Sequence, residues 1–183
     1  NMANPITKDL LPSYGSVQKF FARDGDIVIY CEDKILRALA DKDILYNADG
    51  SSNLVASNRV IGNVTPFAGE YGISTNPESF AFYGFRAYNA DPKRGVVLRL
   101  SMDGLTPISA ANMGGYFRQS LFGYDNEIIG SYDNRNKLYN LSYGSDTVCF
   151  SEDVNGWVTF KSFLPQNGIS LNNAYYSYNT GEL

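Results

Sequence analysis

Two acidic side chains, Asp133 in the run SYDNRNK and Glu152 in the run FSED, are the residues that could form a catalytic carboxylate pair. Glycoside hydrolysis requires two carboxyl groups at a fixed separation, one as acid and one as base or nucleophile. Both residues stand next to turns, where an acidic side chain often accepts hydrogen bonds from backbone amides. We therefore expect Asp133 and Glu152 to stabilise turns, and we assign no catalytic residue.

The run Ser101–Thr106, SMDGLT, is close to the Asp-box turn of sialidase-type β-propellers. It lacks the Ser-x-Asp-x-Gly spacing and the following Trp, and such turns are structural even in sialidases, so the run does not predict catalysis. Other acidic turns do not follow the ligand spacing of a calcium loop: Asp24–Asp26, Asp41–Asp43 and Asp49–Gly50. We predict solvated turns there and no metal or cofactor.

Histidine is absent from the 183 residues. Neither a Ser-His-Asp or Cys-His nucleophile nor a His-ligated zinc or iron site can therefore be built, and we predict that the protein is not an enzyme. The two cysteines, Cys31 and Cys149, lie in strand-like runs. We expect two buried thiols, although the sequence leaves open whether they pair.

The chain is acidic, with a net charge of −4 and a pI of about 4.8, and it has no long basic stripe. It therefore lacks the electrostatic footprint of a sequence-specific nucleic-acid-binding protein, although DNA could still pass through an acidic lumen. No apolar run approaches the roughly 20 residues that span a bilayer, and no signal peptide is visible.

The chain must position these residues on short antiparallel strands. Phe82–Ser109 reads as three strands separated by turns at Asp91–Gly95 and Met102–Gly104, and Ile128–Phe163 repeats the pattern. The 14 Tyr and 11 Phe residues also favour strands. The pattern predicts an all-β protein, mostly an antiparallel meander, with one short helix within Ala110–Leu121.

Three strand-turn-strand units fall at about 17–61, 79–109 and 127–163, and Ala174–Tyr178 begins a fourth. Repeats of this size indicate part of a β-propeller, with an open β-sandwich as the alternative. We expect a single β-rich domain or a fragment of a larger protein, because NMANP at the start and Asn179–Leu183 at the end look like cut positions. The long loop 65–78 is expected to be a contact surface.

Aromatic residues supply the candidate interface positions, which are Trp157, Tyr175, Tyr176, Phe67 and Tyr71. The ring of Trp157, the only Trp, stands at a predicted strand start, where it could anchor either the core or a subunit seam. Three arginines in or beside the 79–109 unit could pair with Asp91, Asp103 or Glu78 and so fix strand register or bridge subunits: Arg86, Arg94 and Arg99. For Lys93 and Arg94, which stand at a turn tip, the simplest interpretation is a solvated tip.

Eight residue runs follow one another in a characteristic order and spacing from about Asn63 to the C-terminus: Asn63–Phe67, Asn76–Phe80, Arg94–Ser101, Asp103–Ser109, Gly130–Asp133, Phe150–Glu152, Gly156–Phe163 and Ser170–Asn173. Together they resemble a large tail protein family of crAss-like bacteriophages, the stabilisation or muzzle protein, which is similar in role to the nozzle of short-tailed phages. The resemblance implies a fragment of a ring-forming virion component without an active site.

This resemblance implies a structural protein of the virion tail that assembles in the bacterial cytoplasm with itself and with other tail subunits around a channel that DNA can traverse. The alternative is a glycan-binding or glycan-cleaving β-propeller module of a host-recognition device. A third hypothesis is a small-molecule-binding β-sandwich of cellular origin, which a deep enclosed apolar pocket would favour.

Overall fold

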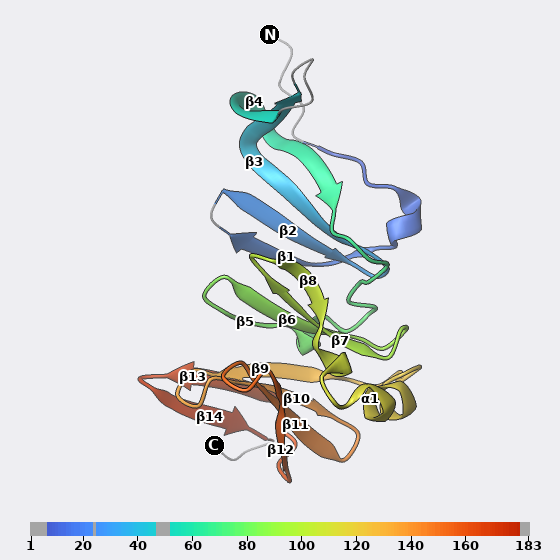
Figure 1. Ribbon diagram of the computed structural model, residues 1–183, viewed down its shortest axis with the longest axis vertical. Coiled ribbons are helices and arrows are strands. Elements are labelled where there is room, and N and C mark those ends of the chain that lie inside the picture. Colours follow the sequence, from blue (N-terminus) through green and yellow to red (C-terminus); the bar gives the residue numbers. More distant parts are fainter. Residues whose placement is uncertain (1–6, 24, 47–51, 180–183) are drawn as a thin grey trace. The chain divides into compact units, whose positions relative to one another are not determined.

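The computed structural model describes residues 7–23, 25–46 and 52–179, and these ranges form an almost entirely antiparallel β protein, as predicted (Figure 1). The chain divides into two compact units, Asn1–Gly72 and Ile73–Leu183, whereas the sequence indicated one β-rich domain or fragment. No helix in the described ranges is long and apolar enough to cross a membrane. The NMANP run, Asp24, the polar run 47–51 and the last four residues lie outside these ranges.

The first unit contains one four-stranded antiparallel sheet with the strands in chain order, preceded by the short 3-10 helix η1 (Pro12–Tyr14). Its strands are β1 (Val17–Arg23), β2 (Asp26–Cys31), β3 (Ile35–Tyr46) and β4 (Ser52–Pro66). The run Lys34–Asp43, KILRALADKD, lies mostly within β3. Cys31 packs with Ile29, Leu36 and Ala38 on one face, as the two-residue period predicts.

The second unit begins with the 3-10 helix η2 (Pro77–Ser79) and a second four-stranded meander. Its strands are β5 (Ala81–Tyr83), β6 (Arg86–Asp91), β7 (Val96–Ser101) and β8 (Gly104–Pro107). The 3-10 helix η3 (Ile108–Ala110) and the helix α1 (Gly114–Ser120) follow. The predicted helix is therefore shorter than Ala110–Leu121, because Asn112 takes a left-handed conformation (φ 64°) that separates η3 from α1.

A third four-stranded meander and a two-stranded hairpin complete the second unit. The third sheet contains β9 (Ile129–Asp133), β10 (Leu138–Tyr143), β11 (Asp146–Ser151) and β12 (Gly156–Lys161), and the hairpin contains β13 (Asn167–Leu171) and β14 (Ala174–Tyr178). β9 lies beside both β5 and β13, so the first strands of the successive sheets are neighbours (Figure 1). This arrangement is typical of propeller-like blades.

Turn chemistry explains why the meanders reverse where they do. Gly95 and Gly104 have φ values of 63° and 104°, the left-handed angles that their positions in the sequence predict. The hairpin turns through Asn172 and Asn173, both with positive φ, which is the two-residue turn that matches the twist of the flanking strands.

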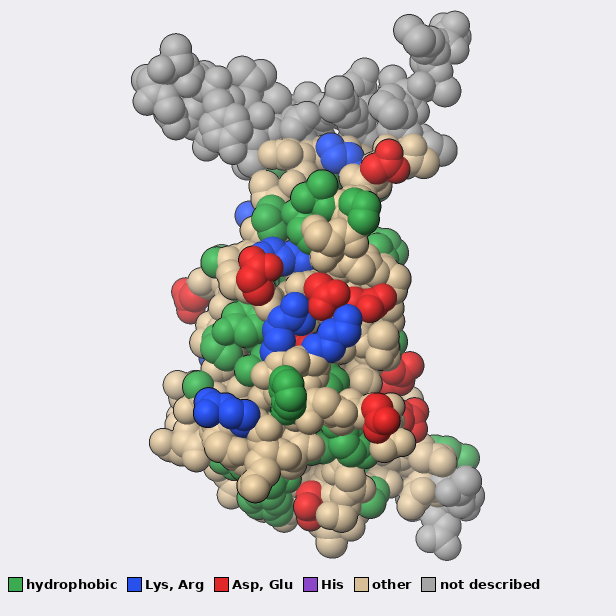
Figure 2. Space-filling model, turned by 90° about the vertical axis from the view of Figure 1, so that its right-hand side faces the viewer, with side chains coloured by type: hydrophobic (Ala, Val, Ile, Leu, Met, Phe, Trp, Pro, Cys, Tyr) green, Lys and Arg blue, Asp and Glu red, His purple; other side chains and the backbone are tan. Residues whose placement is uncertain are grey.

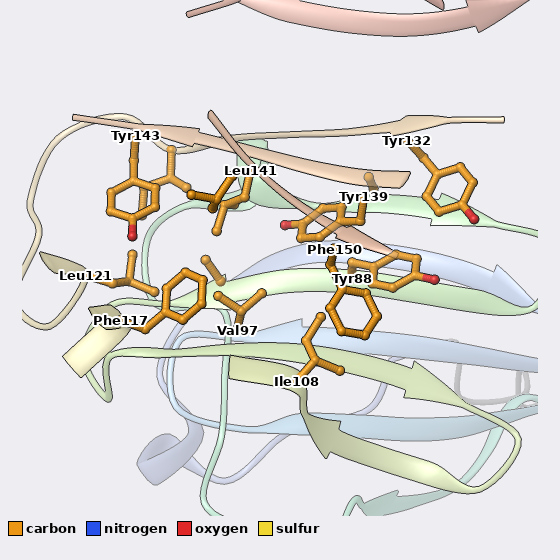
Figure 3. Close-up of a cluster of buried hydrophobic side chains, with 14 residues drawn as sticks. Tyr88, Val97, Ile108, Phe117, Leu121, Tyr132, Tyr139, Leu141, Tyr143 and Phe150 are labelled. Atoms are coloured by element: carbon orange, nitrogen blue, oxygen red, sulfur yellow. The ribbon is translucent and has the colours of Figure 1, made fainter. Parts of the chain in front are cut away.

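The main core of the second unit lies between the second and third sheets and is closed at one end by α1 (Figure 3). Tyr88 and Val97 project from the second sheet toward Tyr139 and Leu141 of the third, and Phe117 of α1 packs beside them (Figure 3). The third sheet approaches η2 closely at Gly130, where an added Cβ would lie only 1.8 Å from the carbonyl oxygen of Ser79. The core therefore requires glycine at this position.

Candidate functional site

A cluster of charged and aromatic side chains joins the second and third sheets at the turn after β11. The carboxylate of Glu152 accepts hydrogen bonds from the hydroxyl of Tyr88 (2.6 Å) and from Nη1 of Arg99 (2.9 Å). The Nε of Arg86 lies 3.6 Å from the oxygen that Arg99 contacts. Only 9% of the Glu152 side chain and 17% of the Arg99 side chain is exposed, so their ion pair is largely buried. We call these four residues the Glu152 cluster.

Strand register places the basic members of the Glu152 cluster. Tyr88 pairs with Arg99 across β6 and β7, so Arg99 lies on the same sheet face as the core residue Val97. A charge on a core-facing position requires a partner, and Glu152 supplies it from the next sheet. The Nε of Arg99 is buried without an acceptor among the described residues, which leaves this guanidinium dependent on its bond to Glu152.

Tyr88 also belongs to a row of stacked rings that crosses between the sheets. Ring centres are 4.8 Å apart for Tyr83 and Tyr132, 5.6 Å for Tyr132 and Tyr88, and 4.8 Å for Tyr88 and Tyr139. Burial, followed by the bond to Glu152, raises the pKa of Tyr88 well above its usual range, and burial raises the pKa of Tyr132 to about 12. Both phenols are therefore protonated near neutral pH and act as packing and donor groups.

An open pocket of about 230 Å³ lies beside the Glu152 cluster and is lined by Phe85, Arg86, Arg99, Ser101, Met102 and Asp103. The Arg86 guanidinium lies 5.3 Å from the centre of the Phe85 ring, a cation–π contact. The Asp-box-like run contributes its first three residues to this pocket. Its Ser101 hydroxyl accepts a hydrogen bond from the backbone of Asp103 (3.3 Å), which is a turn contact.

The structure assigns Asp133 and Glu152 to different partners. Asp133 is buried and accepts hydrogen bonds from the backbone N–H groups of Arg135 and Asn136, both at 3.1 Å, which confirms the predicted turn role. The expectation that Glu152 also serves a turn is wrong, because its carboxylate binds the side chains of the second sheet. Strand β10 separates the two acids, since Leu138 pairs with Asp133 on one side and with Ser151 on the other.

The arginine predictions hold in part. Arg94 pairs with the buried Asp91 at 3.0 Å, which is one of the pairings considered for it and not the solvated tip that was the simplest interpretation. Arg86 and Arg99 pair instead with Glu152, a residue that sequence reasoning assigned elsewhere. No local signal in the sequence predicts this partner, because the alternation of VVLRLS puts Val96, Leu98 and Leu100 on one face and leaves Arg99 on the other, more polar face.

A second polar cluster lies on the face of the third sheet that is turned away from the core. The Oδ1 of Asn140 accepts hydrogen bonds from the Cys149 thiol (3.0 Å) and from Nζ of Lys161 (3.2 Å). Burial raises the pKa of the Cys149 thiol, while the charge of Lys161 acts in the opposite direction. Cys31 and Cys149 are both free and buried, which confirms the expectation of two buried thiols.

Trp157 anchors the core of the second unit. Its Nε1 donates a hydrogen bond to the carbonyl oxygen of Ile108 (3.0 Å), and its ring centre lies 4.6 Å from that of Phe117 and 5.5 Å from that of Phe150. Of the two roles that the sequence left open for this ring, these contacts give it the core role.

Phe67 and Tyr71 lie half-buried in the loop of the first unit. The backbone N–H of Phe67 bonds to the carbonyl of Ile35 (3.0 Å). The largely buried Lys34 holds the middle of the loop, because its Nζ donates hydrogen bonds to the carbonyl of Gly69 (2.8 Å) and to Glu70 (2.7 Å). The two rings are thus placed by a loop fixed to its own sheet.

The hairpin turns its two adjacent tyrosines in opposite directions. Tyr175 faces the third sheet, where its hydroxyl lies 2.7 Å from that of Ser131. Tyr176 lies on the opposite face with exposed apolar residues, and we call this surface the outer hairpin face: Ile169, Leu171, Tyr176 and Tyr178. A shallow groove of about 320 Å³ runs along part of it.

In the second unit, the fold and the Glu152 cluster define packed antiparallel meanders with an aromatic intersheet core. On the face shown in Figure 2, Lys and Arg side chains are scattered among acidic and uncharged ones, and no continuous basic area is visible. Comparison of the chain with protein-family models and with curated proteins gave no match.

Proposed function

We propose that this chain is a non-enzymatic structural protein of a bacteriophage tail, of the muzzle or nozzle type, that packs against itself in a ring and against other tail subunits. The resemblance of its residue runs to that family supplies the identity. The observation that carries the structural role is the Glu152 cluster. In it, the carboxylate of Glu152 and the guanidinium groups of Arg86 and Arg99 neutralise one another and hold two sheets together.

The chemistry of the cluster supports this role. Tyr88 is fully buried and its pKa is raised, so it is a poor nucleophile near neutral pH. Asp133 has its carboxylate occupied by turn amides. Both arrangements stabilise the folded structure, and a subunit of an assembly requires a stable and rigid fold.

The test is to look for the protein in purified virions. Peptides of the chain should be found by mass spectrometry in density-purified phage particles, and an antibody against it should label the tail. Particles that lack the chain would refute the tail assignment. Turnover of a glycan by the purified protein, lost in Asp133→Ala, would refute the non-enzymatic role.

Glycan binding is the second candidate, and the pocket beside the Glu152 cluster favours it. Guanidinium, carboxylate and hydroxyl groups there can hydrogen-bond to sugar hydroxyls, and the half-exposed Phe85 offers a ring for stacking. A glycan array tests it: binding that is lost in Phe85→Ala and kept in Phe122→Ala, an exposed Phe outside this pocket, would support a glycan-binding module.

A further inference from the structure

The polar cluster on the outer face of the third sheet holds a side-chain amide and an amine in contact. Asn140 of β10 is fully buried, and its Oδ1 accepts hydrogen bonds from the Cys149 thiol (3.0 Å) and from Nζ of Lys161 (3.2 Å). Both partners are donors, so the amide oxygen faces them and the NH₂ group points away. The Nδ2 of that group is buried and makes no hydrogen bond to any described residue.

Strand register brings these residues together. Asn140 pairs with Cys149 across β10 and β11, and Lys161 of β12 pairs with Thr147, two residues before Cys149. Residues two apart lie on one face of a strand, so all four side chains project from the same face of the sheet. Strand β11 separates the amide from the amine, and the long flexible stem of lysine reaches across it.

The Nζ of Lys161 is surrounded by aromatic rings. It lies 5.3 Å from the ring centre of Phe163 and 5.8 Å from that of Tyr175. Within the described ranges, no carboxylate lies within ion-pair distance of it. Asp133, on the same face, binds the turn groups of Arg135 and Asn136 instead. A carboxylate partner would hold the ammonium in its charged form, and its absence leaves Nζ directed at the amide.

We propose that Lys161 and Asn140 form an intramolecular isopeptide bond that joins β12 to β10. The Nζ of Lys161 gives up a proton and attacks the side-chain carbonyl carbon of Asn140. The bond from Nζ to this carbon forms and the bond from the carbon to Nδ2 breaks. The Nδ2 leaves as ammonia, which takes up the proton and departs as ammonium, so the reaction consumes no oxidant or other co-reactant.

The geometry of the contact favours this reaction. The Nζ lies 3.2 Å from the oxygen that is bonded to the attacked carbon, which is the close approach that an intramolecular reaction needs. The Cys149 thiol donates to the same oxygen and stabilises the negative charge that develops on it. The leaving nitrogen is the buried Nδ2, so its departure removes an unsatisfied donor from the interior.

The bond would fix β12, at the edge of the third sheet, to the inner strand β10. It closes a covalent loop between residues 140 and 161, and a closed loop restricts the unfolded chain. The thermal midpoint of the wild-type protein should therefore exceed that of an unlinked variant by about 5–10 °C. The inference goes beyond the proposed function and does not depend on a virion location.

Mass spectrometry of the full chain tests the proposal. The wild-type protein should be lighter than its sequence by one ammonia molecule, and protease digestion should release a branched peptide that joins the segments around Asn140 and Lys161. The branched peptide is the decisive observation, because an Asn-Gly sequence such as Asn155–Gly156 can also lose ammonia by forming a succinimide.

Two lysine variants provide the comparison. Lys161→Arg keeps the charge and a hydrogen-bond donor but has no primary amine, so it should yield no branched peptide and keep the mass that this bond removes. Lys137→Arg, which alters an exposed lysine paired with Asp153, should form the bond as the wild type does. Circular dichroism shows whether each variant is folded.

A folded wild-type chain that yields no branched peptide after prolonged incubation would overturn the proposal and leave an ordinary hydrogen bond. A branched peptide at Asn140 that persists in Lys161→Arg would also overturn it. The outcome is separable from the proposed function. An unlinked chain found in virions refutes only the isopeptide bond, and a linked chain missing from virions refutes only the tail assignment.

Discussion

Glu152→Gln should destabilise the second unit because it removes the negative charge from a largely buried cluster while keeping the size of the side chain. The Arg99 guanidinium would keep only a neutral acceptor in a place where 17% of its side chain reaches solvent. Tyr88 would also donate to an uncharged oxygen, which weakens its 2.6 Å bond.

The magnitude follows from these exposures. Removing one member of a fully buried ion pair costs about 3–5 kcal/mol. Arg99 is not fully buried and 36% of the Arg86 side chain is exposed, so water partly solvates both cations. We therefore expect the free energy of unfolding to fall by about 2–3 kcal/mol.

Urea denaturation followed by the fluorescence of Trp157, the only tryptophan, measures this loss within the second unit. Asp153→Asn is the matched control, because its exposed 3.4 Å pair with Lys137 should contribute less than about 1 kcal/mol. If Glu152→Gln and Asp153→Asn had the same midpoint and slope, the Glu152 cluster would not hold the sheets together and the structural argument would fail.

Three further predictions concern the core and the thiols. Gly130→Ala should cost about 1–3 kcal/mol in urea unfolding because its Cβ would meet the Ser79 backbone, whereas Gly115→Ala, which meets nothing within 4 Å, should be neutral or stabilising. Burial raises the pKa values of Tyr88, Tyr132, Tyr139 and Tyr143. The free energy of unfolding should therefore keep its full value below about pH 10 and fall as the pH rises above this value. The fall should be about 1.4 kcal/mol per pH unit for each tyrosine that ionises only in the unfolded chain. The part of the phenolate absorbance that comes from these four tyrosines should therefore rise only together with unfolding; their ionisation in the folded protein would contradict this. Cys31 and Cys149 should react with a thiol reagent only as fast as the protein opens, and rapid labelling of the native protein would contradict their burial.

Local signals made much of the fold predictable from the sequence. The turns at Asp91–Gly95 and Met102–Gly104 combine alternation with glycines that need positive φ, and both turns occur where predicted. The length of α1 was not predictable, because Asn112 adopts a left-handed conformation that no local pattern requires.

Contacts between sheets were less accessible to sequence reasoning. Glu152 and Arg99 are 53 residues apart, and turn-forming neighbours made a local role for Glu152 the simplest expectation. The alternation of VVLRLS places Arg99 on the face opposite Leu98 and Leu100, and it does not show that a second sheet covers this face as well. The same limit applies to the hairpin, where alternation separates Tyr175 from Tyr176 but does not decide which of them faces the third sheet.

A structural repeat answers that last question. In the third sheet, Gly130 is the second residue of the first strand and Tyr139 the second residue of the next, and both the glycine backbone and the tyrosine hydroxyl meet Ser79. In the hairpin, Gly168 and Tyr175 hold the same two positions, and both meet Ser131 of the preceding sheet. A glycine admits the close approach and a tyrosine hydroxyl bonds across it. The recurrence shows that the hairpin packs on the third sheet through the same two positions by which the third sheet packs on Ser79, and it explains why Tyr175 is turned inward while Tyr176 remains on the surface.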